Sequence, residues 1–594
     1  MKLRFKEKND NLEIERNKAK KKSNSLSNFR GLTMVAIAII LCTIFFDRYT
    51  FLRGIILIVL VLTFVYFVYK HSIAIKELKW IERLIEVNKK YIDRVSGKWK
   101  SFSDKGEEYC NEEHFYGMDL DIVGRNSLFQ LINTTNTFKG REKLAKVLLG
   151  PHDSIGEIVK RQQAVKDLGE KLDFVQQLEA SGIKSSGITK KPDELIDFSS
   201  RKNFAEKIGF ISIVRYIPVI LIALLLVNLF IRVQLVSYVA VSLFVVQILF
   251  NIYGAMKFSK DLDEVGIYSD DLTTYKNIIE VIEKENFDAP YLKELSKKIA
   301  IDENGGKKSI EALEKVSRKI AIRNNALIYF PLNLILLLDY RFIYNLEKWR
   351  KNYGVGMDKI LEYIGEIEML ASLSVLIHTE ECSKFPIFKE EKGIVEGKNL
   401  GHPLINREKR VSNDINISNK IFIITGSNMA GKTTILRTIG INMVLAYAGA
   451  PICGGSMNCS MMDIFTSMRI GDNLGEGIST FYAELLKIKE IIAFSKEEKP
   501  MIFLMDEIFR GTNSLDRIVG AETVVKTLDR PWIIGGIATH DFELCHLDEN
   551  SRIENYHFSE GYENDNIVFD YKIKKGKATT TNAQFLMKMV GLEI

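Results

Sequence analysis

The chain has 594 residues, of which 46% are hydrophobic and 27% are charged, and its formal net charge is +6. This length allows several domains, and so much apolar material beside so many charges indicates membrane segments joined to domains with a polar surface. The modest net charge excludes a global basic field for nucleic acid, and the six scattered cysteines, without Cys-x-x-Cys pairs or Cys/His clusters, exclude a disulfide framework.

Residues 1–70 predict a basic tail followed by a membrane hairpin. Residues 1–30 carry many Lys and Arg and few apolar residues, so we expect a disordered cytoplasmic tail there. Two apolar runs, 31–46 and 54–69, are separated by a short polar break, and 31–70 is interpreted as a first transmembrane hairpin. Basic residues flank both ends of the hairpin, which predicts that both ends lie in the cytoplasm.

The next segments predict a helical domain and a second hairpin. Apolar residues recur at three- and four-residue spacings in 71–208, which is typical of helices. Residues 209–256 contain two further apolar runs, so about four transmembrane helices are expected in all, with pairs of buried core helices as the rival interpretation. Residues 257–392 again predict a helical core or lever-like region, in which the short run 327–338 is expected to be a buried helix.

Residues 393–594 alternate short β-like runs with helices, which predicts an α/β domain built on a parallel sheet. An apolar strand there runs into Gly-x-x-x-x-Gly-Lys-Thr, the pattern of a phosphate-binding P-loop. Its glycines let backbone N–H groups point inward, Lys432 can reach the β and γ phosphates, and Thr433 can hold Mg²⁺. The residues predicted to bind ATP are Gly426, Ser427, Asn428, Met429, Ala430, Gly431, Lys432, Thr433 and Thr434.

Two later strand ends supply candidate catalytic groups. The strand from Met501 ends in two adjacent acids, Asp506 and Glu507. We expect Asp506 to bind Mg²⁺ and Glu507 to polarise the water that attacks the γ phosphate. The strand from Trp532 ends in His540, which we expect to contact the γ phosphate or the attacking water.

These motifs, in this order, resemble the ATPase domain of the MutS mismatch-repair family. The resemblance covers GSNMAGKTT, LMDEIFRGTNSLD, ATHDFEL, the lead-in Gly401–Leu404 with Asn413-Asp414, and a signature loop from Met468 to Leu485. It implies an ATPase that uses ATP and Mg²⁺ and forms a homodimer with composite sites, in which Ser479 reaches the nucleotide of the other subunit. A weaker match, from Arg125 onward, resembles the start of the family's helical core.

The departures from the family leave two functions open. No segment resembles the mismatch-reading domain with its Phe-x-Glu wedge; Phe5-Lys-Glu7 has the letters by chance. We therefore expect a membrane-anchored, multi-pass MutS-family ATPase with its N-terminus and ATPase domain in the cytoplasm, DNA-binding by resemblance. The alternative is a mechanochemical membrane ATPase in which dimer closure moves the hairpins. An ABC-type transporter subunit fits less well, because no Leu-Ser-Gly-Gly-Gln signature is present.

Overall fold

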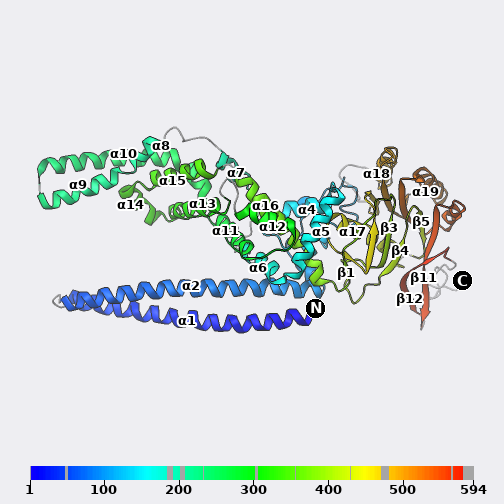
Figure 1. Ribbon diagram of the computed structural model, residues 1–594, viewed down its shortest axis with the longest axis horizontal. Helices are drawn as coiled ribbons and strands as arrows, with labels where there is room; N and C mark the ends of the chain where they lie inside the picture. The colour runs from blue at the N-terminus through cyan, green and yellow to red at the C-terminus, as the bar shows by residue number, and fades with distance from the viewer. Residues whose placement is uncertain are drawn as a thin grey trace.

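A computed structural model describes residues 2–46, 51–183, 192–200, 208–231, 233–300, 306–354, 356–427, 430–469, 480–510, 512–563 and 566–578. The molecule is elongated, with a helical part at one end and an α/β domain at the other (Figure 1). The helices of the first part are α1 Lys2–Phe46, α2 Phe51–Val95, α3 Leu128–Ile132, α4 Phe138–Leu149, α5 Ile155–Glu170, α6 Leu172–Gly182, α7 Asp193–Ser200, α8 Ile208–Val214, α9 Ile217–Ile231, α10 Gln234–Ile267, α11 Ser269–Lys284, α12 Pro290–Ala300, α13 Gly306–Ile320, α14 Ala326–Leu336, α15 Leu338–Tyr353 and α16 Met357–Thr379.

The expectation of a disordered tail over residues 1–30 is wrong, because these residues form the first two thirds of helix α1. Phe5, Leu12 and Ala19 recur every seven residues and are buried against α2, whose Ile81 and Ile85 complete a small apolar cluster with the latter two. A repeat of seven keeps one stripe of a helix facing its neighbour, as in a coiled coil. The packing of this stripe orders a segment whose average composition is that of a disordered chain.

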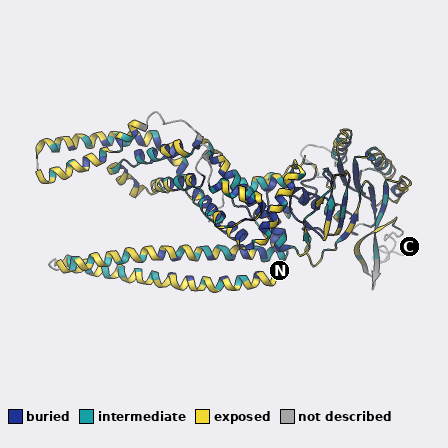
Figure 2. Cartoon of the chain, in the orientation of Figure 1, coloured by how far each residue is buried: buried dark blue, intermediate teal, exposed yellow. Residues whose placement is uncertain are grey.

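Four helices of the described chain are long and apolar enough to cross a membrane: α1, α2, the stretch Gly209–Ile231 that contains α9, and α10. At most 22% of the most apolar window in each of them is buried, which contradicts the rival interpretation as pairs of core helices. Both hairpins extend toward the same end of the molecule, at the left of Figure 1, and Figure 2 shows them largely exposed there. One bilayer plane can therefore hold all four apolar segments.

The prediction that residues 327–338 form a buried helix is also wrong. Helix α14 covers most of this run, and Leu327 and Phe330 are 89% and 67% exposed. The helix ends at Leu337, which has left-handed backbone geometry with φ 47°. The axis of the next helix, α15, makes an angle of 84° with the axis of α14. A run this short is typical of a buried helix of the core. In α14, however, only Tyr329 and Asn333 are buried.

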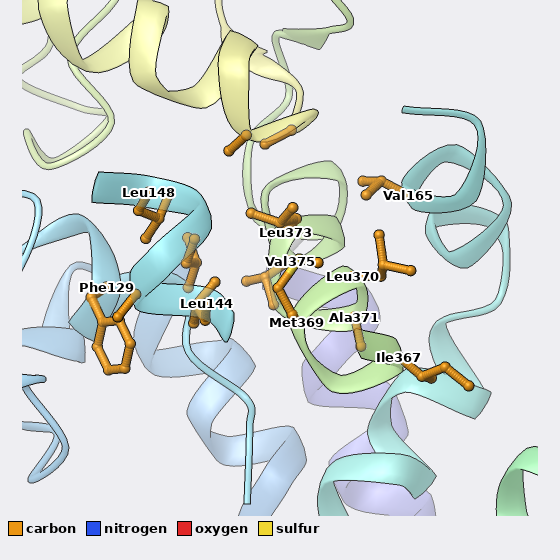
Figure 3. Close-up of a cluster of buried hydrophobic side chains, with 14 of the residues drawn as sticks. Phe129, Leu144, Leu148, Val165, Ile367, Met369, Leu370, Ala371, Leu373 and Val375 are labelled. Atoms are coloured by element: carbon orange, nitrogen blue, oxygen red, sulfur yellow. The ribbon is translucent and has the colours of Figure 1, made fainter. Parts of the chain in front are cut away.

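The helical core is centred on α16, which is buried along most of its length. Leu144 and Leu148 of α4 pack on one side of it and Val165 of α5 on the other (Figure 3). Glu368 lies within this core, where it accepts hydrogen bonds from the backbone N–H of Thr137 and from its hydroxyl. The burial of α16 joins segments that are more than two hundred residues apart in the sequence.

The α/β domain contains a six-stranded sheet in the order β12-β11-β5-β10-β9-β8, parallel except for the edge strand β12. This confirms the α/β prediction, although two short strands that pair with this domain, β1 and β2, precede the expected boundary at residue 393. Its strands are β1 Ser383–Lys384, β2 Ile387–Phe388, β3 Val395–Leu400, β4 Asn413–Asn416, β5 Ile421–Thr425, β6 Ile452–Cys453, β7 Ser456–Cys459, β8 Asp463–Ser467, β9 Met501–Asp506, β10 Ile533–Ala538, β11 Ile553–Glu563 and β12 Asn566–Lys575, and its helices are α17 Lys432–Ala448, α18 Thr480–Ser495 and α19 Ser514–Leu528.

Candidate functional site

The glycine-rich loop connects the central strand β5 to helix α17. Gly426 and Gly431 have φ angles of 146° and 109°, a backbone conformation that favours glycine. Lys432, at the first position of α17, is buried and donates hydrogen bonds to the carbonyls of Gly426 (2.6 Å) and Ser427 (3.0 Å). Burial lowers the pKa of the Lys432 ammonium. The loop therefore folds back over its own lysine; Asn428 and Met429 lie outside the described residues.

The first acid of the predicted pair meets this loop directly. The hydroxyl of Thr433 donates a hydrogen bond of 2.5 Å to Oδ2 of Asp506, at the end of β9. The other oxygen of Asp506, Oδ1, is buried and has no hydrogen-bond partner among the described residues, and burial raises the pKa of this carboxyl. A hydroxyl beside a buried carboxylate oxygen is a donor set that suits Mg²⁺, which takes one or two carboxylates together with phosphate oxygens and water.

Glu507 follows in a strained backbone conformation, with φ 47°, and its N–H donates to the carbonyl of Ala538 on the neighbouring strand β10. His540, just beyond β10, places Nδ1 3.6 Å from Oε1 of Glu507. Its other nitrogen lies 3.9 Å from Asp541, which Arg517 holds through two hydrogen bonds of 2.7 Å. The two predicted catalytic side chains are therefore neighbours at the ends of adjacent strands.

The predicted signature loop is described only at its two ends, and Ser479 lies outside the described residues. Helix α18 begins directly after it, at Thr480, and carries a buried carboxylate, Glu484. Oε1 of Glu484 accepts a 2.8 Å hydrogen bond from the backbone N–H of Phe509, two residues after Glu507. The end of the signature segment is thus bonded to the loop that carries the acids. Glu484 lies within the signature segment, but nothing in the motif predicts this hydrogen bond.

The other end of the signature loop is held by the helical part of the chain. Asp119, in the segment between α2 and α3, accepts hydrogen bonds from the hydroxyl of Thr466 (2.7 Å) and from Lys487 of α18 (2.7 Å). It also accepts hydrogen bonds from the backbone N–H groups of Met468 (3.2 Å) and Arg469 (3.0 Å). No motif in the sequence predicts this junction, because an isolated aspartate about 350 residues upstream carries no local signal.

Tyr571 is a further residue beside the loop, and no motif in the sequence marks it. The residue is 43% exposed, and a Cβ atom added to Gly431 would lie 3.4 Å from the Cδ1 atom of its ring. Asn413, from the predicted lead-in segment, holds this part of β12 through a 3.0 Å hydrogen bond to the Tyr571 carbonyl. An exposed aromatic ring next to a glycine-rich loop is suited to contact a planar base.

Comparison with known proteins agrees with this geometry. The family model described as MutS domain V matches residues 422–592. A DNA mismatch repair protein MutS from Aquifex pyrophilus is 27% identical over 559 residues, 86% of this chain and 64% of the relative. The same protein from Shouchella clausii is 29% identical over 266 residues, 43% of this chain and 30% of the relative.

A third relative, the MutS protein of Lactococcus lactis subsp. cremoris strain SK11, is 30% identical over 266 residues, 43% of this chain and 31% of its own length. The chain thus spans less than two thirds of the length of these curated relatives. The match to domain V coincides with the strands and loops that carry the candidate site, and the Aquifex pyrophilus relative extends the similarity into the helical part. Residues 422–592 therefore form a MutS domain V, and the similarity of the chain to MutS proteins extends beyond that domain.

Proposed function

We propose that this chain is a membrane-anchored ATPase that binds ATP with Mg²⁺ in the loop Gly426–Thr434. Thr433 and Asp506 would hold the Mg²⁺, which would neutralise charge on the phosphates when bound. Glu507 would polarise the attacking water, and His540 would contact that water or the γ phosphate. The exposed ring of Tyr571 would stack on the base.

One observation carries this proposal: three segments far apart in sequence converge at the carboxyl ends of the adjacent parallel strands β5, β10 and β9. Thr433 bonds Asp506, and His540 lies beside Glu507. Ligands of open parallel sheets bind at this edge, where helix N-termini and loops meet. A merely structural role for these groups does not explain why Oδ1 of Asp506 is buried with no hydrogen-bond partner in the part of the chain that the structure describes.

Replacing Glu507 by Gln tests the catalytic assignment. The amide keeps the shape of the side chain but cannot act as a base, so we expect ATP turnover to be abolished while ATP binding persists. Fluorescent-nucleotide binding and phosphate release, measured on the detergent-purified full chain, separate the two steps. Glu490→Gln, an exposed acid near the end of α18 that leads to the amino end of β9, is the matched control and should leave both unchanged. Normal turnover in the Glu507→Gln variant would refute the role.

The family resemblance also supports a homodimer in which Ser479 completes the site of the partner subunit. Mixing two inactive variants, Lys432→Met and Ser479→Ala, tests this arrangement. In a mixed dimer one site combines both defects and the other site has neither, so at equal amounts about a quarter of the wild-type activity should return. If Ser479 acts within its own subunit, every site carries a defect and mixing restores nothing.

Two cellular roles follow from the resemblance and from the helices. In the first the ATPase acts on DNA, as the names of the relatives indicate for those proteins. In the second, closure of the dimer moves the membrane hairpins, which is favoured by the uninterrupted 45-residue helix α2 that joins the first hairpin to the core. DNA binding through phosphate contacts should weaken by orders of magnitude between about 50 and 200 mM salt.

Stimulation of the ATPase decides between the two roles. Turnover is measured in detergent, with duplex DNA, and after reconstitution into vesicles. Stimulation by DNA, with steeply salt-dependent binding, supports the first role. Robust turnover without DNA binding, raised on reconstitution, supports the second.

A further inference from the structure

Helix α14 lies beside the second hairpin and exposes an apolar surface. It ends partway along the length of that hairpin. Leu327, Phe330 and Ile335 are 89%, 67% and 51% exposed, while Tyr329 and Asn333 on the opposite face are buried. The helix packs against α9 and α10 and then turns sharply at Leu337 into α15. Its exposed surface is therefore continuous with the apolar segments of the hairpin.

The end of α14 shows how its backbone is satisfied away from water. The carbonyls of Leu334 and Ile335 have no later helical N–H to bond, and both accept from the side-chain amide of Gln247 on α10, at 2.7 and 3.0 Å. The carbonyl of Asn333 accepts from Asn251, also on α10, at 2.7 Å. Helix ends in water need no such partners, whereas inside a bilayer each free carbonyl must find a donor within the protein.

The position of Gln247 along α10 fixes the depth of this helix end. Lys257 is the first charged residue after the apolar part of α10, and Gln247 precedes it by about 15 Å of helix. This distance is half of a hydrocarbon core of about 30 Å. The first residue of α14 follows shortly after Arg323. The Arg323 guanidinium donates hydrogen bonds to Ser259 and Asp263, which lie beyond Lys257 on α10.

Three polar side chains between these two levels, those of Tyr329, Asn333 and Asp339, are hydrogen-bonded to one another. Asp339 accepts hydrogen bonds from Arg323 (2.5 Å) and Tyr329 (2.7 Å), and its N–H donates to the side chain of Asn333. Asn333 also donates to the hydroxyl of Tyr329 at 3.1 Å. This network closes the inner face of the α14–α15 bend and leaves only apolar side chains on the outer face of α14.

We propose that α14 is a re-entrant half-helix, which enters the cytoplasmic leaflet beside α10, reaches the middle of the bilayer and returns at Leu337 without crossing. The occupant of its exposed surface is the hydrocarbon of that leaflet. The inference rests on the proposed membrane placement of the hairpins and adds a fifth membrane element to them. Gln247 is the residue that holds the buried helix end.

The test compares three single cysteines at positions of similar exposure. Ile335 of α14, Leu225 of α9 and Val519 of α19 are 51%, 53% and 61% exposed. The background replaces Cys42, Cys110 and Cys382, the exposed cysteines of the described chain. The remaining three are buried and have raised thiol pKa values, about 12 for Cys453 and Cys459, so they should not react.

Each variant of the full chain is reconstituted into vesicles and labelled with a water-soluble maleimide. We expect Ile335→Cys to react at least about tenfold more slowly than Val519→Cys, and as slowly as Leu225→Cys. If Ile335→Cys reacts as fast as Val519→Cys while Leu225→Cys stays protected, α14 lies outside the bilayer and the inference fails, although the hairpins are inserted. If Leu225→Cys also reacts fast, the membrane placement itself fails, and the inference with it.

Two further measurements test whether lipid contacts the exposed surface of α14 and whether Gln247 holds its end. A bimane label at Ile335→Cys should be quenched by lipids brominated near the middle of their acyl chains, whereas protection without quenching would mean that a protein covers the surface and would overturn the proposal. Adding Gln247→Leu removes the donor for the buried carbonyls, so Ile335→Cys should gain labelling while Leu225→Cys remains protected. Unchanged protection in the double variant would overturn the role of Gln247.

Discussion

Replacing Asp119 by alanine tests how firmly the helical part of the chain holds the α/β domain. Asp119 is 3% exposed, and its carboxylate accepts four hydrogen bonds, two of them from the backbone N–H groups of Met468 and Arg469. Leaving a buried donor unpaired costs about 1–3 kcal/mol, and the charge-assisted bond from Lys487 is lost as well. We therefore expect the free energy of unfolding to fall by about 3–5 kcal/mol.

The assay is thermal unfolding of the detergent-purified full chain, followed by tryptophan fluorescence. Trp532 reports on the α/β domain, where its ring N–H donates to the carbonyl of Ser495. For a unit of roughly 200 residues the expected loss lowers Tm by about 6–20 °C. Asp173→Ala is the matched control: its side chain is 80% exposed and, among the described residues, pairs only with Lys8, so stability should change by less than about 0.5 kcal/mol. A Tm of the Asp119→Ala variant within about 2 °C of wild type would refute the reasoning.

Three other substitutions have defined outcomes. Burial raises the pKa of Glu368 from 4.5 to about 7, so the stability that this group contributes is full below pH 4.5 and is lost as the pH rises through 7. Wild type should lose on the order of 3 kcal/mol over that interval and Glu368→Gln should not, as measured by urea midpoints at a series of pH values. Gly536→Ala should destabilise the α/β domain by about 1–3 kcal/mol in the same urea assay, because its Cβ would lie 2.1 Å from Cζ of Phe422. Arg517→Lys cannot reproduce the two bonds to Asp541, so turnover should fall several-fold with little change in ATP binding; equal turnover would mean that this pair does not position the histidine.

The candidate site could be predicted from sequence wherever its residues sit at strand ends within short motifs. The glycine-rich loop, the acids at Asp506 and Glu507 and the histidine at His540 each follow an apolar run, and parallel strands bring such ends together. Asp119 and Tyr571 could not be found in this way. Their neighbours at the site come from distant segments, and no local pattern encodes those contacts.

The fold was predictable where periodicity was strong and failed where composition misled. The first thirty residues have the average composition of a disordered tail, and only a sparse stripe of Phe5, Leu12 and Ala19 marks the face that packs on α2. The run at 327–338 is too short to cross a membrane, so length favoured a core helix. Its partners Gln247 and Asn251, on another helix, are what make an apolar helix end tenable outside the core.

Helix α2 has a mechanical consequence that depends only on its length. Its 45 residues form one rod of about 67 Å, whose far end lies in the apolar hairpin and whose near end lies shortly before Asp119 in the sequence. A tilt of about 5° at the near end would displace the far end by about 6 Å, since a continuous helix carries rotation along its whole length. If nucleotide binding at the proposed site tilts α2, a bilayer that resists the displacement would change the affinity of that site by the same free energy, because coupling between two sites is reciprocal. The thickness of the bilayer would then regulate the proposed ATPase.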